Sequence, residues 1–144
     1  MIVRKMKLED IEKVCEIENI LFSSPWKSHD FESSSVDNNN IYLVVVEHDE
    51  IIAYCGLWGV AGEGQINNVA VKKEYQNKKI GFLMISELIE RGKGKNLTAF
   101  TLEVRVSNER AIRLYHRLGF KDAGIRKNFY DKPKEDALIM WLHM

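Results

Sequence analysis

A basic loop is the first stretch of this chain that could do chemistry. It reads EYQNKKIGFLM, residues 74–84, and it lies between an apolar run that ends in NVAV and an apolar helical pattern. The first N–H groups of a helix lack partners within the helix, and the helix dipole adds partial positive charge there. With Lys78 and Lys79 beside them, these groups could hold an anion such as a phosphate. Crossovers that bind nothing share this pattern, however, and the loop matches neither a P-loop nor a GxGxxG fingerprint.

Glu103 and Tyr115 are the candidates for proton transfer. Glu103 lies in the run TLEV, between Leu102 and Val104, so its carboxylate faces either solvent or a cleft. Only in a cleft, where it is partly desolvated, would it be suited to take a proton from a substrate. Tyr115 shares a helical stripe with apolar residues three and four positions away, which is typical of a core aromatic. The local pattern leaves both roles open for each residue.

Three aromatic residues stand beside flexible backbone. Trp26 ends the segment SSPW, and Phe129 and Tyr130 lie in RKNFYDKP. Two roles are open for them: they cover a binding cleft, or they seal the edge of the core.

No metal or covalent-catalysis motif stands out. The two cysteines, Cys15 and Cys55, lie in apolar patterns, which predicts small buried hydrophobic residues. Two cysteines are too few for a disulfide scaffold, which is typical of a reducing compartment. No metal site is expected, because neither cysteine has a metal-ligand spacing with any of the histidines, at positions 29, 48, 116 and 143.

Charge and hydropathy exclude several classes of protein. Lys and Arg together number 21, Asp and Glu also number 21, and the formal net charge is zero. General binding to nucleic acid or to a membrane surface calls for a basic excess, so neither partner is expected. The N-terminus has no secretory pattern, and the stretch IIAYCGLWGVAG is far short of the roughly 20 apolar residues of a membrane span. A cytoplasmic protein is therefore expected.

Strands and helices are mixed along the whole chain, which predicts one α/β domain over residues 1–144. Alternating or continuous apolar residues predict strands at 2–6, 41–48, 51–60, 65–71, 98–104, 121–130 and 135–144. Apolar residues at helical spacing predict helices over 8–22, after Ser28, from Ile80 to the RGKG segment at 91–94, and over 107–120. We expect a hairpin turn at Asp49 and Glu50, and Ser107 as the N-cap of the last helix.

Taken in chain order, these segments resemble the GNAT acetyltransferases over nearly the whole chain, and most of all the ribosomal-protein-alanine N-acetyltransferases. The matching segments are SSPW, NNVAVKKEYQNKKIG, LEVRVSNERAIRLYHRLGF, GIRKNFY and EDALIMWL. The third is the most specific, because it combines a strand glutamate, an asparagine after the strand and a helix tyrosine just ahead of LGF. The resemblance implies the GNAT fold: a single α/β (α+β) domain with a mixed, mostly antiparallel central sheet flanked by helices.

The resemblance also implies where acetyl-CoA, the co-substrate of this family, binds. The family pattern of the phosphate loop, Q/R-x-x-G-x-G/A, reads here from Gln76 to Gly81, with Lys79 in place of the first glycine. Lys79 keeps its N–H and adds a charge, or it crowds the loop, so we expect weaker affinity for acetyl-CoA rather than loss of binding. The implied contacts are Val69, Ala70, Val71, Asn77, Lys78, Lys79, Ile80, Gly81, Phe82 and Asn108.

For catalysis the resemblance implies Glu103 as general base and Tyr115 as general acid, and Trp26 and Tyr130 are expected to bind the substrate. The implied reaction is direct transfer of acetyl, in a ternary complex, to the N-terminal α-amine of a protein, an alanine-starting small-subunit ribosomal protein. Two alternatives stay open. One is acetylation of a small amine, which a cleft closed by Trp26 and Tyr130 would favour. The other is a non-catalytic CoA-binding module, for which Lys79 is the only support.

Overall fold

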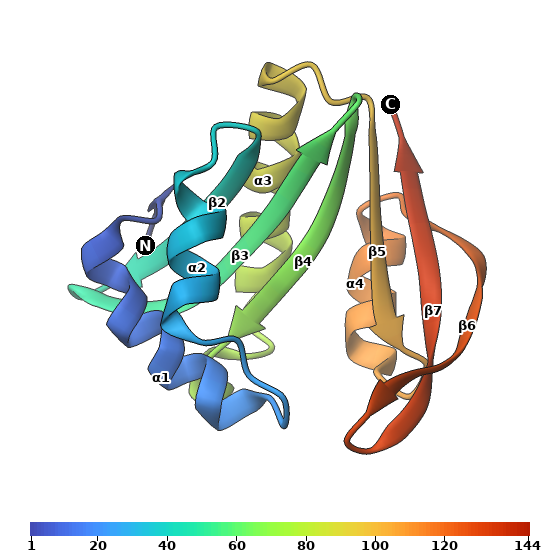
Figure 1. Ribbon diagram of the computed structural model, residues 1–144, viewed down its shortest axis with the longest axis horizontal. Coiled ribbons are helices and arrows are strands. Elements are labelled where there is room, and N and C mark those ends of the chain that lie inside the picture. The colour runs from blue at the N-terminus through green and yellow to red at the C-terminus, as the bar shows by residue number, and fades with distance from the viewer.

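Seven strands form one sheet in which a single pair of neighbours is parallel. The computed structural model describes residues 1–144, and its sheet has the order β1-β2-β3-β4-β5-β7-β6 (Figure 1). β4 and β5 are parallel, and all other neighbours are antiparallel, which confirms the mixed, mostly antiparallel sheet. The strands are β1 (Ile2–Lys5), β2 (Asn40–Glu47), β3 (Glu50–Val60), β4 (Glu63–Val71), β5 (Ala99–Arg105), β6 (Lys121–Asp131) and β7 (Lys134–His143).

Helices cover both faces of this sheet. The helices are α1 (Ile11–Leu21), α2 (Ser28–Val36), α3 (Ile80–Gly94) and α4 (Glu109–Arg117), with short 3₁₀ turns at Leu8–Asp10 and Lys73–Tyr75. In Figure 1, α1 and α2 lie in front of the sheet and α3 lies behind it. Neighbouring strand residues point to opposite faces, so Tyr42 packs in the core under α1 and α2, and Leu43 packs in the core under α3. No helix is long and apolar enough to cross a membrane.

Two local predictions are wrong by one residue. The turn between β2 and β3 is formed by His48 and Asp49, with φ of 50° and 63°, while Glu50 already belongs to β3. Positive φ at both central residues gives the hairpin turn whose twist matches that of the strands. The N-cap of α4 is Asn108 rather than Ser107, because the Asn108 Oδ1 accepts a hydrogen bond from the N–H of residue 111 at 3.2 Å.

β4 and β5 pair only over their first residues and then separate. Gln65 and Thr101 form the last pair between them, and beyond it β4 pairs only with β3 and β5 only with β7. The register of β4 against β3 shifts at an extra residue, Asn67, which forms a β-bulge. A bulge bends its strand and increases the local twist, so the bulge at Asn67 favours the separation. Figure 1 shows β4 and β5 close together at the top of the view and spread apart below.

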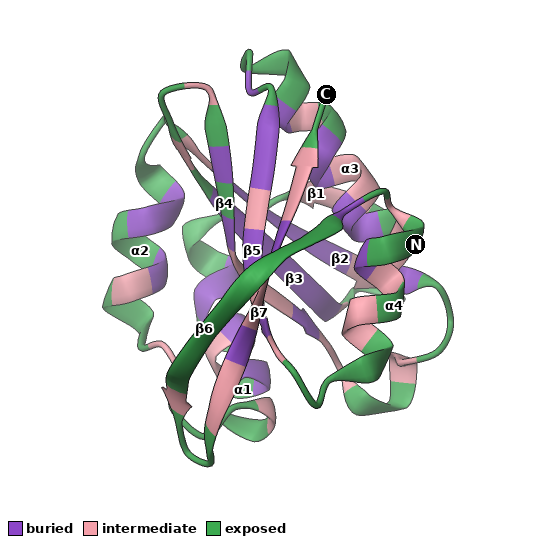
Figure 2. Ribbon diagram, turned by 90° about the vertical axis from the view of Figure 1, so that its right-hand side faces the viewer, coloured by how far each residue is buried: buried purple, intermediate pink, exposed green.

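β6 is the exposed edge of the sheet. Figure 2 shows it crossing in front of β7, and only Tyr130 along its length is partly buried. Its residues include Lys121, Asp122, Arg126 and Lys127. Charged side chains on an edge strand disfavour pairing with another chain, so the sheet ends here.

Candidate active site

A cleft of about 1340 Å³ opens between the separated parts of β4 and β5. Its walls come from β4, β5, α4, the start of α3, the segment between α1 and α2, and the turn between β6 and β7. Lys78 does not line it; its ammonium lies 5.6 Å from the centre of the Tyr75 ring. All other predicted site residues line the cleft: Trp26, Val69, Ala70, Val71, Asn77, Lys79, Ile80, Gly81, Phe82, Glu103, Asn108, Tyr115 and Tyr130.

The start of α3 presents backbone N–H groups to the cleft. α3 begins at Ile80, and Leu83 donates the first helical hydrogen bond to the carbonyl O of Lys79 at 3.1 Å. The N–H groups of Ile80, Gly81 and Phe82 lie ahead of this hydrogen-bond ladder, so a ligand can accept from them. Since the helix dipole adds positive charge at the same place, the loop is suited to a phosphate.

Gln76 holds this loop in place through both ends of its carboxamide. Its Nε2 donates to the carbonyl O of Val71 at 3.0 Å, and its Oε1 accepts from Nη1 of Arg110 at 2.7 Å. The loop is thereby tied to the end of β4 on one side and to α4 on the other. Gln76 was not among the predicted site residues, although its place at the first position of the phosphate-loop pattern was a signal for such a role.

Lys79 has a left-handed backbone, with φ 64° and ψ 13°. Glycine adopts this conformation freely, whereas an L-residue loses roughly 1–2 kcal/mol. The chain therefore keeps the loop geometry for which glycine is best suited, even though lysine stands there. Gly81 is favoured for a different reason: a Cβ on it would lie 3.1 Å from Cδ2 of Leu114, a tight contact where α3 and α4 approach each other.

Glu103 presents an uncommitted carboxylate to the cleft. It lies on β5 opposite Ile139 of β7, it is half-buried, and it forms no hydrogen bond and no ion pair. Its charge is felt by Tyr130, whose pKa is raised first by burial and then by Glu103. The sequence left open whether the Glu103 carboxylate faces solvent or a cleft, and in the structure Glu103 lines the cleft.

Tyr115 is both a core residue and a cleft residue. Its side chain is 6% exposed, and its ring packs against that of Phe120 with 5.8 Å between ring centres. Burial raises the pKa of Tyr115 above its ordinary value, so the phenol keeps its proton through the neutral range. The hydroxyl makes no hydrogen bond within the protein, and the residue lines the cleft, so its proton is available to a ligand.

Glu18 anchors the segment between α1 and α2, and it was not among the predicted site residues. Its side chain is 4% exposed, its Oε2 accepts from the backbone N–H of Trp26 at 2.9 Å, and its Oε1 accepts from the hydroxyl of Tyr54. Trp26 then packs against Phe31 and Trp58, at 5.1 Å and 6.2 Å between ring centres. The available signal was a carboxylate on the apolar stripe of a helix.

Arg105 organises the opposite wall. Its guanidinium lies 4.3 Å from the centre of the Tyr130 ring, donates to the carbonyl O of Pro133 at 2.8 Å, and pairs with Glu135 at 3.1 Å.

The two walls of the cleft touch at one hydrogen bond, which the Ser23 hydroxyl donates to the carbonyl O of residue 132. The rings of Trp26 and Tyr130 make no contact with each other.

Asn67 carries an unsatisfied polar group into the same cleft. It is the bulge residue of β4, it lines the cleft, and its Nδ2 is buried with no hydrogen-bond partner. Its neighbour Asn68 is satisfied, because the Tyr42 hydroxyl donates to its Oδ1 at 2.9 Å. A buried amide without a partner costs about 1–3 kcal/mol in the free protein.

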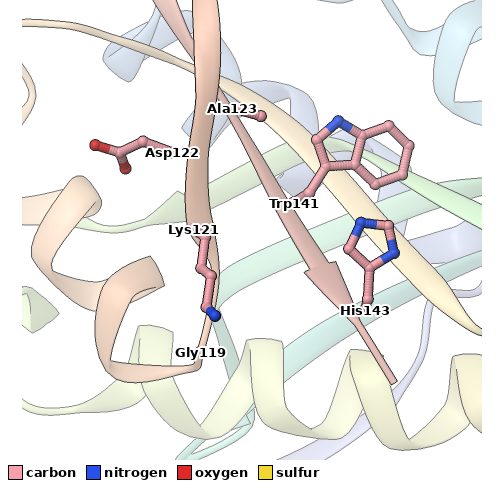
Figure 3. A pocket seen from close by; sticks show the side chains of 6 residues that line it. All are labelled: Gly119, Lys121, Asp122, Ala123, Trp141 and His143. Carbon is pink, nitrogen blue, oxygen red and sulfur yellow. The ribbon is translucent and has the colours of Figure 1, made fainter.

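A second, smaller hollow of about 360 Å³ shares no residue with the cleft. Its main feature is the stacking of Trp141 on His143, with 5.4 Å between ring centres and 7° between ring planes. Figure 3 shows both rings on β7, together with the other lining residues, Gly119, Lys121, Asp122 and Ala123. We assign it no role in the chemistry of the cleft, to which it contributes no side chain.

Comparison with known proteins agrees with the fold. The sequence matches the acetyltransferase (GNAT) family over residues 10–120. A Bacillus subtilis protein assigned provisionally as a ribosomal protein bS18-alanine N-acetyltransferase is 43% identical over 141 residues, which cover 97% of this chain and 93% of the relative. The ribosomal protein bS18-alanine N-acetyltransferase of Escherichia coli K12 is 30% identical over 97% of this chain and 95% of its own.

A solved structure shows the same architecture. The crystal structure of the ribosomal-protein-S18-alanine N-acetyltransferase from Escherichia coli superimposes with a TM-score of 0.90 and 29% identity, covering 99% of this chain and 92% of that one. This chain therefore belongs to the GNAT acetyltransferase family and is an acetyl-CoA-dependent acetyltransferase.

Proposed function

We propose that this enzyme transfers acetyl from acetyl-CoA to the N-terminal α-amine of a protein, and that its target is the alanine-starting N-terminus of ribosomal protein bS18. The relatives that are 43% and 30% identical carry that activity in their names. The observation that carries the proposal is the presence, in one cleft, of an uncommitted carboxylate, Glu103, and a buried protonated phenol, Tyr115. These two groups supply the base and the acid that acetyl transfer to an amine requires.

The proposed place of the donor is the start of α3 and the adjoining edge of β4. The free N–H groups at Ile80, Gly81 and Phe82 would bind the diphosphate of acetyl-CoA. The β4 residues Val69, Ala70 and Val71 line the same cleft and would hold the pantetheine arm through backbone groups. The bound donor supplies an activated acyl thioester to the cleft between β4 and β5.

Glu103 is proposed to act as the general base. An amine attacks a carbonyl only after losing its proton, and a carboxylate in reach, directly or through a water, can take it. An α-amine has a pKa of about 7.7–8.0, against about 10.4 for a lysine side chain. A useful fraction of N-termini is already neutral near pH 7, so one carboxylate is sufficient for an N-terminal acceptor.

Tyr115 is proposed to act as the general acid. The sulfur leaving group of the thioester needs a proton as the carbon–sulfur bond breaks, and the Tyr115 phenol keeps its proton because burial raises its pKa. Its free hydroxyl has no competing acceptor in the protein. The Cys55 thiol acts on Tyr115 through its charge, but it is buried, its pKa is raised by that burial and it does not line the cleft, which favours direct transfer in a ternary complex over an acyl-enzyme.

One contact favours a different acceptor, a free small amine. The bond from the Ser23 hydroxyl to the carbonyl O of residue 132 joins the two walls that carry Trp26 and Tyr130, the residues expected to bind the acceptor. A peptide would have to displace this contact, whereas a small amine would not. A single exposed hydrogen bond contributes only about 0.5–1.5 kcal/mol, so we retain the protein N-terminus as the proposed acceptor.

Thiol release from acetyl-CoA with three acceptors tests the proposal. The acceptors are a peptide with the N-terminal sequence of bS18, the same peptide blocked at its N-terminus but containing lysine, and a panel of small amines. Release with the free N-terminus alone is the expected result. Thiol release with small amines alone would show that the acceptor is a small amine and not a protein N-terminus. No thiol release with any of the three acceptors, while CoA still binds, would indicate a non-catalytic CoA-binding module.

A further inference from the structure

α4 places three arginines along the side of the cleft next to the phosphate loop. Arg110, Arg113 and Arg117 are spaced by three and four residues, which puts them on one face of the helix. All three line the cleft, as does Lys79 at the N-cap of α3. Seven residues of helix span about 10 Å, so the row extends well beyond the helix start that would hold the diphosphate.

Two of these arginines are held in position by neutral partners. Nη1 of Arg110 donates to Oε1 of Gln76 at 2.7 Å, and the guanidinium carbon of Arg117 lies 5.3 Å from the centre of the Phe82 ring. Both partners belong to the phosphate loop or to the first turn of α3. Arg113 lies between them in the helix and forms no hydrogen bond, ion pair or ring contact. Arg110 and Arg117, at the ends of the row, are therefore held in position, whereas the guanidinium of Arg113, at its centre, has no partner within the protein.

No carboxylate neutralises this row. None of Arg110, Arg113, Arg117 and Lys79 forms an ion pair, although the chain as a whole has equal numbers of basic and acidic residues. Arg105, which lines the same cleft, is paired with an acidic side chain. A group of unpaired cations in a cleft raises the local positive potential and attracts an anionic ligand.

The donor carries an anion that the phosphate loop does not account for. The ribose that bears the diphosphate of CoA on its 5′ oxygen bears a phosphate monoester on its 3′ oxygen. A phosphate monoester has a charge of about −1.5 to −2 at pH 7 and three strong acceptor oxygens. If the diphosphate is placed at the start of α3, the 3′-phosphate lies one sugar away from it, within reach of the adjoining face of α4.

We propose that Arg110, Arg113 and Arg117 form a binding site for the 3′-phosphate of CoA, with Arg113 as its principal ligand. A guanidinium binds a phosphate through two parallel N–H groups, which gives both strength and direction. The inference rests on the proposed placement of the diphosphate. Binding of the 3′-phosphate by these arginines would also offset the weaker affinity for acetyl-CoA that is expected because Lys79 stands where a glycine would favour diphosphate binding. The consequence is discrimination between CoA and 3′-dephospho-CoA.

Calorimetric titration of CoA and 3′-dephospho-CoA into the whole protein tests this site without an acceptor. We expect the wild type to bind CoA about tenfold more tightly than dephospho-CoA, as a charged hydrogen-bonded contact warrants. Arg113→Gln is expected to reduce this ratio to near one by weakening CoA alone, and Arg113→Lys to restore part of it. Arg91→Gln, which removes a positive charge from the last turn of α3, is the matched control and is expected to keep the wild-type ratio.

Each other outcome contradicts a stated part of the inference. Equal affinity of the wild type for both ligands would overturn the 3′-phosphate site and leave the donor assignment intact. An equal loss of both affinities in Arg113→Gln would overturn the assignment of Arg113 to the 3′-phosphate and place it at the diphosphate. Binding of neither ligand would overturn the placement of the donor and this inference with it. Failure to acetylate any acceptor changes none of these affinities, so it bears on the proposed function alone.

Discussion

Gln65 of β4 and Thr101 of β5 form the last backbone pair between their strands, and the cleft begins directly beyond them. The next residues of β4 include the bulge at Asn67, and the next residues of β5 include Glu103. The same separation thus exposes both the strand edge proposed to bind the donor and the carboxylate proposed to act on the acceptor. A fully paired β4 and β5 would leave no space for either substrate between them.

Replacement of Glu103 tests the proposed base. We expect Glu103→Gln to lower kcat by about 10²-fold near pH 7, which is the lower range for loss of general-base catalysis. The loss is expected to shrink above about pH 8, where the α-amine of the acceptor releases its proton unaided. A pH series of kcat, together with the Kd for CoA, measures both effects. Glu12→Gln, at an exposed site, is the control, and a wild-type rate in Glu103→Gln would remove Glu103 from the mechanism.

Removal of the Tyr115 hydroxyl tests the proposed acid. Tyr115→Phe keeps the ring packed against Phe120, so we expect the free energy of unfolding to change by less than about 1 kcal/mol. The chemical step is expected to slow by about 10²-fold, measured as single-turnover acetyl transfer at saturating acetyl-CoA. A variant that is less stable but fully active would make Tyr115 a core residue only.

Substitution of Lys79 separates strain from charge. Because Lys79 has φ of 64°, Lys79→Gly is expected to raise the free energy of unfolding by about 1 kcal/mol. If the lysine crowds the loop, affinity for CoA is kept or increased, and a clear loss would show that its charge binds phosphate. Lys78→Gly is the matched control, because its φ is not in the left-handed region and glycine there should only destabilise. Urea unfolding and titration with CoA give the two quantities.

Glu18 is expected to act through the segment that it holds. Glu18→Gln leaves one of its two donors, Trp26 N–H or the Tyr54 hydroxyl, facing an amide NH₂, and should cost about 1–3 kcal/mol of stability. The KM for the acceptor peptide should rise, while the KM for acetyl-CoA stays the same. Glu16→Gln, which breaks only an exposed ion pair, should change neither. A rise in the KM for acetyl-CoA would contradict this separation.

Alkaline pH is expected to destabilise the protein through buried phenols. Burial raises the pKa of Tyr42 to about 12, against about 10 in the unfolded chain. Below about pH 10 the phenol is protonated in both states, and its contribution to stability is constant. Between about pH 10 and 12 only the unfolded chain releases the proton, so the free energy of unfolding falls as pH rises. Urea unfolding across this range measures the decline, and Tyr42→Phe should reduce its slope.

Local periodicity determined most of the secondary structure, because it depends only on neighbouring side chains. The alternation of Phe100, Leu102 and Val104 predicted β5 and placed Glu103 on the other face, and helical spacing predicted the apolar side of α3. The segment LEVRVSNERAIRLYHRLGF brought in the family resemblance, and with it the candidates Glu103 and Tyr115. The family match and the seven-stranded sheet confirm the fold that this resemblance implied.

Contacts between distant segments decided what the sequence left open. Ser107 and Asn108 are both good capping residues. Asn108 is the N-cap of α4, whereas the Ser107 N–H donates to Oε2 of Glu135, far along the chain, at 2.8 Å. Glu18 is buried only because Trp26 and a strand tyrosine supply its hydrogen bonds. The same holds for the position of the α4 arginines beside the phosphate loop, and for the cleft itself, since the parting of β4 from β5 is a property of the sheet. Hydrogen bonds and charges of this kind join residues that no local pattern connects.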